Sequence, residues 1–199
     1  MFSENRSELA VPVVGFLLLG FATLFAAISI FNAKWDFFEG IGTIDPWAFR
    51  VLGLLLAVVA FFSLAKAYLI EGAAFGVFAV FLAVYSMVPT TDGIFQLAVL
   101  ALGLAVVSVI IAMMSYRVGD LMVFLIAVLS LIAFVSVMFA NDTESIAFVI
   151  AGVGLLAVAV VALISAVLEW LFVQDVAMDF ADYMYGDGEE CGCGCESEE

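Results

Sequence analysis

The chain has 199 residues, of which 67% are hydrophobic and only 13% are charged, and its formal net charge is −15. A soluble domain carries about 25% charged residues, so this composition excludes an ordinary water-soluble globular fold. The sequence has no histidine, which excludes histidine-based catalysis and histidine-based pH sensing. The acidic balance also argues against nucleic acid as a partner, because the two would repel each other.

Six apolar runs fill almost the whole chain. Each has, or nearly has, the ~20 residues that a helix needs to cross a hydrocarbon core about 30 Å thick. The runs are apolar on all sides, without the period-two alternation of a membrane barrel, and a helix satisfies its own backbone hydrogen bonds in lipid. We therefore expect an all-α polytopic protein of the lipid bilayer, a bundle of six transmembrane helices. The expected spans are 9–31, 47–65, 73–88, 93–114, 121–140 and 146–168, and the membrane domain covers 1–174.

The connections between the runs are short. The second and third runs are separated by little more than the sequence IEG at 70–72, and the fourth and fifth by SYRVGD at 115–120. Such connections make consecutive spans antiparallel neighbours, so we expect a compact up-down bundle. Gly72 and Gly76 form a GxxxG pair at the start of the third span, and close helix packing is its expected role.

Five basic residues indicate the orientation. If the N-terminus lies in the cytoplasm, three of them lie on the cytoplasmic side and two outside, a weak preference in the sense of the positive-inside rule. The inner three are Arg6, Lys66 and Arg117, and the outer two are Lys34 and Arg50. Because six is an even number, we expect both termini on the cytoplasmic side, and we expect the protein in the cell (plasma) membrane.

The interior of the expected spans holds no ionisable side chain near its middle. Coupled pumps keep such groups at depth, and hydrolases need a nucleophile with its base, so we expect neither a carboxylate proton relay nor enzymatic activity. The polar side chains within the spans are hydroxyls and one amide, Gln96. They either form hydrogen bonds between helices or line a sparsely polar pore, and both interpretations stay open.

The tail at 175–199 is acidic, begins with the pattern of an amphipathic helix, and ends in a cluster of cysteines. Cys191, Cys193 and Cys195 alternate with glycine. Thiolates suit Zn²⁺, Cu(I) or iron–sulfur clusters, but a complete zinc site normally has four ligands. The cluster is a candidate soft-metal site, a redox-labile segment or an inert one, and no other cofactor is expected.

Two stretches carry a family resemblance, AFFSLAKAYLIEGAAFG at 60–76 and AGVGLLAVAVVALISAVLEW at 151–170. With six spans in about 200 residues, the chain resembles the acetate uptake transporter family, the six-helix succinate–acetate permeases. Gly72, Phe75 and Gly76 match the family's Gly-Asn-Thr-Phe-Gly run, in which alanines replace the polar pair here. Of the family's opening Asn-Pro-Ala-Pro-Leu-Gly motif only Pro12 and Gly15 remain.

The resemblance implies passage of a small monocarboxylate such as acetate through an apolar constriction. It places that constriction at Phe21, Tyr85 and Leu129, with Gln96 as a polar contact on the pathway. It also implies a homo-oligomer, since members of the family assemble as hexamers. The residues themselves leave two alternatives open: a channel for a neutral solute such as urea or a short amide, and a non-transporting structural membrane protein that forms oligomers or arrays.

Overall fold

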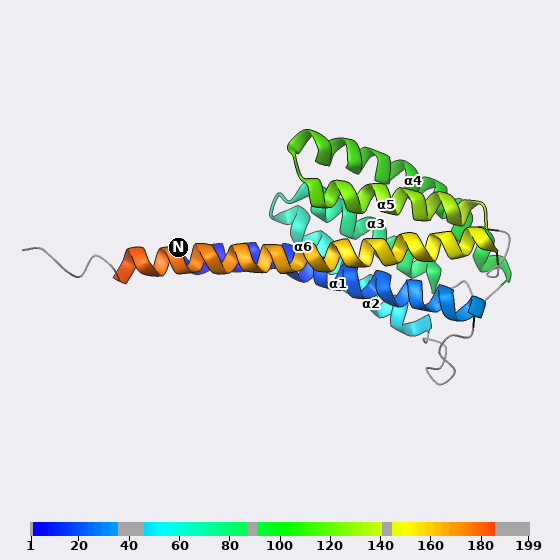
Figure 1. The fold of residues 1–199 in the computed structure, drawn as a ribbon, viewed down its shortest axis with the longest axis horizontal. Coiled ribbons are helices and arrows are strands. Elements are labelled where there is room, and N and C mark those ends of the chain that lie inside the picture. Colours follow the sequence, from blue (N-terminus) through cyan, green and yellow to red (C-terminus); the bar gives the residue numbers. More distant parts are fainter. Residues whose placement is uncertain (1, 36–45, 87–90, 141–144, 186–199) are drawn as a thin grey trace, which may run out of the picture.

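The computed structural model describes the backbone of residues 2–35, 46–86, 91–140 and 145–185, and the side chains of 11–32, 35, 46–86, 97–140 and 145–171. The described residues form six helices and no strand, as the sequence predicted (Figure 1). The helices are α1 (Phe2–Trp35), α2 (Pro46–Ala65), α3 (Leu69–Tyr85), α4 (Thr91–Val118), α5 (Leu121–Met138) and α6 (Ile146–Tyr185).

Five of these helices contain apolar segments long enough to cross a membrane. The segments are Val11–Asn32, Pro46–Ala65, Leu97–Val118, Leu121–Met138 and Ile146–Leu171. The remaining helix, α3, is apolar but has only 17 residues. Its length is about 25 Å at 1.5 Å per residue. The chain is therefore a helical membrane protein, and α3 is its shortest helix.

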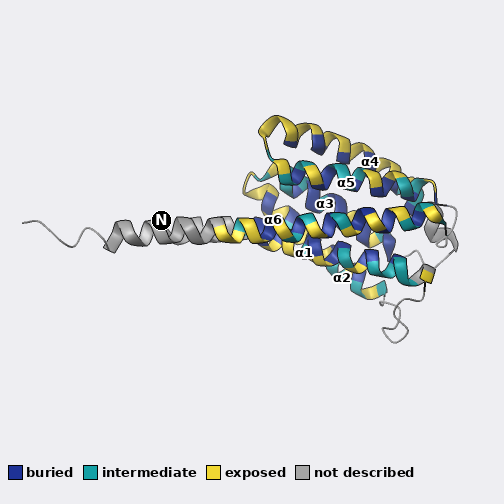
Figure 2. Cartoon of the chain, in the orientation of Figure 1, coloured by how far each residue is buried: buried dark blue, intermediate teal, exposed yellow. Residues whose placement is uncertain are grey.

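Outward-facing side chains of the bundle are apolar, as lipid contact requires. Figure 2 shows exposed residues along α2 and α4, the two outermost helices. On α2, Leu54 is 67% exposed and Phe61 is 68% exposed. Large apolar surfaces of this kind are rare on soluble monomers, and in a bilayer they are covered by acyl chains.

Four helices close into a ring. α1 contacts α3 and α6, and α5 contacts α3 and α6, so that these four helices, which we call the inner ring, surround a common interior. α2 packs outside against α1 and α3, and α4 packs outside against α3 and α5. Nine of the 17 residues of α3 are buried, because helices cover it on most sides.

The turn between α2 and α3 differs from the prediction. The sequence IEG at 70–72 lies inside α3, and the break falls at 66–68. There Ala67 has φ of 67°, its N–H donates to Leu64 O at 3.2 Å, and the N–H of Tyr68 donates to Ser63 O at 2.9 Å. This is a Schellman motif, which usually carries glycine at the left-handed position. An alanine there gives no recognisable stop signal in the sequence.

The two ends of the bundle are distinct. α1 begins and α6 ends at the same end (Figure 1), and we call this the N-terminal end. Because consecutive helices are antiparallel, the turns after α2 and α4 also lie there, with Lys66 and Arg117 beside them. Arg50, in the first turns of α2, lies at the other end, where its Nε donates to Ser86 Oγ at 3.2 Å.

Candidate functional site

A cavity of about 410 Å³ lies at the N-terminal end of the inner ring, and we call it the acidic cavity. All four helices or their caps contribute side chains: Phe16, Glu71, Asp120, Met122, Ser165, Leu168 and Glu169. α3 begins only at Leu69, whereas α1 and α6 continue past this level (Figure 1). The short helix α3 therefore leaves space beside its longer neighbours α1 and α6.

Three carboxylates line the acidic cavity, and no basic side chain is among its described lining residues. Asp120 is held by capping α5, because its Oδ1 accepts a hydrogen bond from the N–H of Val123 at 3.1 Å. Asp120 and Glu71 both act electrostatically on Glu169, so the three carboxyl groups are close enough to influence one another. A cavity lined by several carboxylates concentrates cations and repels anions.

Glu71 lies in the first turn of α3, ahead of the apolar run that begins at Ala73. Its side chain is half-buried, and the negative charge of Asp120 acts on it. Among the described residues, no three Asp, Glu, His or Cys side chains are placed to hold one metal ion. The carboxylates thus line the space without converging on a common point.

The remaining polar group of the acidic cavity is also an acceptor. The hydroxyl of Ser165 donates its proton to Val161 O at 2.8 Å, and the side chain is only 2% exposed. What Ser165 can still offer a ligand is therefore an oxygen lone pair. The ionised carboxylates also only accept hydrogen bonds. The cavity therefore fits best a solute that donates hydrogen bonds.

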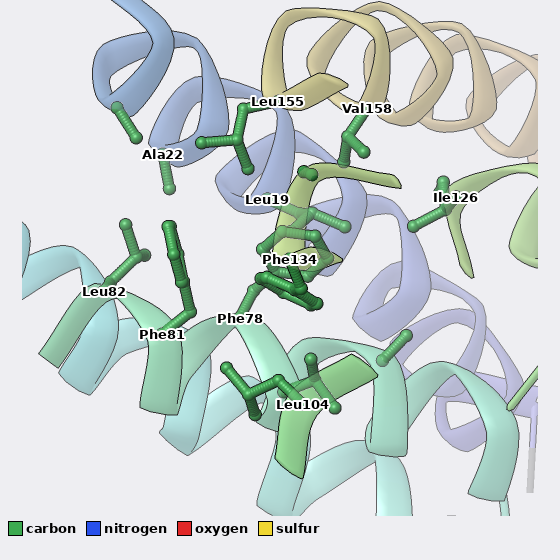
Figure 3. Close-up of a cluster of buried hydrophobic side chains, with 14 of the residues drawn as sticks. Leu19, Ala22, Phe78, Phe81, Leu82, Leu104, Ile126, Phe134, Leu155 and Val158 are labelled. Carbon is green, nitrogen blue, oxygen red and sulfur yellow. The ribbon is translucent and has the colours of Figure 1, made fainter. Parts of the chain in front are cut away.

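Beyond the acidic cavity the interior of the inner ring is filled. Phe78 and Phe81 of α3 meet Phe134 of α5, with ring centroids 5.8 Å and 5.3 Å from Phe134 and 6.5 Å from each other. The exposed fractions of these three side chains are 1% or less. Figure 3 shows them packed among Leu19 of α1, Ile126 of α5, and Leu155 and Val158 of α6.

Two of the three residues predicted to form the constriction lie in or against the core. Tyr85 is 5% exposed, stacks on Phe81 at 5.6 Å and shares a hydrogen bond with Ser29. Leu129 is half-buried and packs against the core. Phe21 is 48% exposed and faces away from the interior. The constriction at these three residues stays a prediction.

The residues of the opening and GxxxG motifs lie at helix contacts. Pro12 is buried inside α1, and a side chain at Gly15 would collide with the ring of Phe75 on α3. A Cβ at Gly72 would lie 3.2 Å from Ala60 O of α2, and one at Gly76 would lie 4.0 Å from Ala60 Cβ. These glycines let the backbones of α2 and α3 approach closely.

Other predicted residues fall outside the described part of the chain. Gln96 belongs to α4, but its side chain is not among those described. Cys191, Cys193 and Cys195 lie beyond residue 185, outside the described residues, so metal binding there stays a prediction. The described backbone of α6 continues without a break past residue 174, where we expected the membrane domain to end.

The acidic cavity itself was not predicted from the sequence. Glu71, Asp120 and Glu169 each stand at the end of an apolar run, and the alternating direction of the runs assigns all three to one end of the bundle. That signal was present. What the sequence does not contain is the lateral order of the helices, which puts α3, α5 and α6 around one space.

Comparisons of the chain with protein-family models, with curated proteins and with solved structures find no match. The resemblance to the acetate uptake transporters therefore depends on the quoted stretches alone.

Proposed function

We propose that the chain is a membrane transporter or channel for a small solute that enters through the acidic cavity. The solute we propose is a small monocarboxylate such as acetate, crossing as the protonated acid. The observation that carries this proposal is the acidic cavity, a space of about 410 Å³ lined by residues of four helices or their caps at one end of a membrane bundle. Its volume falls in the range of small-molecule sites, ~300–1,000 Å³.

The charge of the cavity favours the protonated acid over the anion. One like charge at ~6 Å costs about 3 kcal/mol at an effective dielectric constant of ~20, and three carboxylates line this space. The neutral acid avoids that repulsion and brings an O–H donor to a cavity that offers acceptors. Urea and short amides have N–H donors and no charge, so the same lining supports a neutral-solute channel as the second candidate.

We also propose six crossings, α3 included, with the N-terminal end of the bundle in the cytoplasm and the protein in the plasma membrane. The direction of the helices supports the six crossings, since α1 begins and α6 ends at the same end. A helix of about 25 Å is a few ångströms short of a typical hydrocarbon core, and bilayers accommodate such a mismatch at modest cost. Assembly as a homo-oligomer, a hexamer as the family resemblance implies, belongs to the same proposal.

The filled interior supports a third candidate, a structural membrane protein that transports nothing. Beyond the acidic cavity, the interior is occupied by Phe78, Phe81 and Phe134, which contact one another and are buried. A transporter needs these side chains to move, whereas a structural protein does not. Measured flux separates the two.

Uptake of labelled acetate into proteoliposomes tests the proposal. We expect protein-dependent uptake, after subtraction of empty liposomes of the same lipid, to rise as the pH falls, because the neutral fraction of the solute grows. Osmotic swelling of the same proteoliposomes in urea measures the flux of a neutral solute. Glu169→Gln removes one of the three carboxylates that repel the anion, so the acetate anion, the main form at neutral pH, should enter in addition to the neutral acid. The ratio of acetate to urea flux at neutral pH should therefore rise severalfold in this variant.

Acetate and urea fluxes no greater than those of empty liposomes, at every pH, would contradict transport and favour the structural candidate. A urea flux without an acetate flux would favour the neutral-solute channel.

A further inference from the structure

Five exposed side chains of α2 lie on one face that runs along most of the helix. They are Trp47, Arg50, Leu54, Val58 and Phe61, and we call them the α2 stripe. Their spacings of three, four, four and three residues place them on the same side of an α-helix. The buried residues of α2 pack against α1 and α3 instead, so the α2 stripe faces the bilayer.

Arg50 is the one charged residue of the α2 stripe, and its side chain is held in place. Its Nε donates to Ser86 Oγ at 3.2 Å, and Ser86, at the C-terminal end of α3, is only 3% exposed. The serine hydroxyl donates its own proton to Ala83 O at 2.7 Å, so its oxygen is the acceptor for Arg50. A guanidinium has five N–H donors. Among the described side chains Ser86 is its only hydrogen-bond partner, so the donors on its two outer nitrogens remain for a ligand.

The positive charge of Arg50 has no counter-charge among the described side chains. Their three carboxylates, Glu71, Asp120 and Glu169, line the acidic cavity at the N-terminal end, whereas Arg50 lies at the other end of the bundle. A charge on the apolar face of a membrane helix is costly unless it is paired. The partner that the bilayer itself offers is a headgroup phosphate, which a guanidinium binds in bidentate geometry.

The position of Arg50 along α2 matches the depth of a headgroup. It lies four residues, ~6 Å, inside the start of the apolar segment Pro46–Ala65, a distance that a long side chain spans. Trp47 precedes it by one turn and is 67% exposed, as expected of an aromatic side chain at the membrane interface. From Arg50 to Phe61 the stripe runs ~17 Å, about half of a hydrocarbon core of ~30 Å.

We propose that the α2 stripe binds a phospholipid whose phosphate pairs with Arg50 and whose acyl chain lies along Leu54, Val58 and Phe61. The charge of Arg50 selects the phosphate, and the buried Ser86 aims the guanidinium at it. The apolar side chains contact an acyl chain over the depth of one leaflet. Such a site exists whether or not the protein transports a solute.

Quenching of a single tryptophan tests the site. Trp35→Phe and Trp170→Phe leave Trp47 as the sole tryptophan, and acyl chains brominated close to the ester group quench its fluorescence on contact. The protein in mild detergent is titrated with a brominated phosphatidylglycerol and, separately, with a diacylglycerol that has the same brominated chains. We expect half-maximal quenching at about tenfold lower concentration of the phospholipid, which is about 1.4 kcal/mol of binding free energy.

Matched substitutions locate the phosphate. Arg50→Gln removes the charge of the α2 stripe, and Arg117→Gln removes an exposed arginine at the other end of the bundle. Arg50→Gln should raise the half-quenching concentration of the phospholipid about tenfold, whereas Arg117→Gln should leave it unchanged. Ser86→Ala keeps the charge but releases the guanidinium, so a severalfold rise is expected. None of the three should change the half-quenching concentration of the diacylglycerol.

Equal half-quenching concentrations for the phospholipid and the diacylglycerol at the unsubstituted site would overturn the proposal, and this comparison holds even where Arg50→Gln does not fold. Equal rises in Arg50→Gln and Arg117→Gln would also overturn it. Release of the quenching by inorganic phosphate at the concentration of the lipid would overturn it in favour of a site for free anions. A Trp47 that neither lipid quenches would overturn it in favour of another occupant of the α2 stripe, such as a second copy of the chain.

Discussion

Leu155→Arg is expected to abolish the folded protein. Leu155 is fully buried in α6 and packs in the interior of the inner ring (Figure 3). The substitution loses the leucine packing, about 2–5 kcal/mol, and places a guanidinium where the described neighbours are apolar. Even the lower scale for a charge at the centre of a membrane helix adds about 2.5–3.5 kcal/mol. The sum is comparable with the whole stability of a domain, about 5–15 kcal/mol.

The measurement is the fraction of protein that elutes as a monodisperse species in mild detergent, which should fall below about a tenth of wild type. Trp170→Arg is the control on the same helix. Trp170 is 55% exposed near the end of the apolar segment of α6, where an arginine can reach the headgroups. Wild-type yield of monodisperse Leu155→Arg would show that the interior is not dry and packed.

Gly20→Leu combined with Gly152→Leu is expected to separate α1 from α6. A Cβ at Gly20 would lie 2.7 Å from Leu163 Cγ, and one at Gly152 would lie 2.9 Å from Ile30 Cγ2. Both contacts join the two helices of the inner ring that continue past the acidic cavity. Overpacking costs about 1–3 kcal/mol at each site, and well-separated sites add, so about 2–6 kcal/mol is expected.

A loss of 2–6 kcal/mol should lower the thermal unfolding midpoint in detergent by several degrees or prevent folding. Gly103→Leu is the control, because a Cβ at Gly103 has nothing within 4 Å and the residue is exposed on α4. It introduces the same side chain where only lipid or detergent is displaced. An equal fall of the midpoint in the control would show that leucine itself, rather than the contact of α1 with α6, is responsible.

The six helices were predictable because apolar run length is written directly in the sequence. The expected fourth and fifth spans begin within two residues of α4 and α5. The stop after α4 was also readable, since Gly119 takes a positive φ of 84° at the turn. The stop after α2 was not, because Ala67 occupies the same kind of position and alanine is a strong helix former.

The site was less predictable than the fold. Apolar helices have no marked polar face, so their sequences give little indication of which side meets which neighbour. Phe21 and Phe78 are equally plausible interior residues by composition, yet Phe21 is 48% exposed and Phe78 is 1% exposed. Only the arrangement of the four inner helices distinguishes them, and that arrangement depends on close contacts such as Gly15 with Phe75.

The crossing of the bilayer by α3 is the premise on which the inner ring and the proposed pathway depend, and cysteine labelling tests it most directly. Lys66→Cys and Thr90→Cys, each in a background where Cys191, Cys193 and Cys195 are replaced by serine, flank α3 in the sequence. We predict that a membrane-impermeant maleimide labels the two positions from opposite sides of the membrane, Lys66→Cys from the side of the N-terminus. Labelling of both positions from the same side would contradict the account.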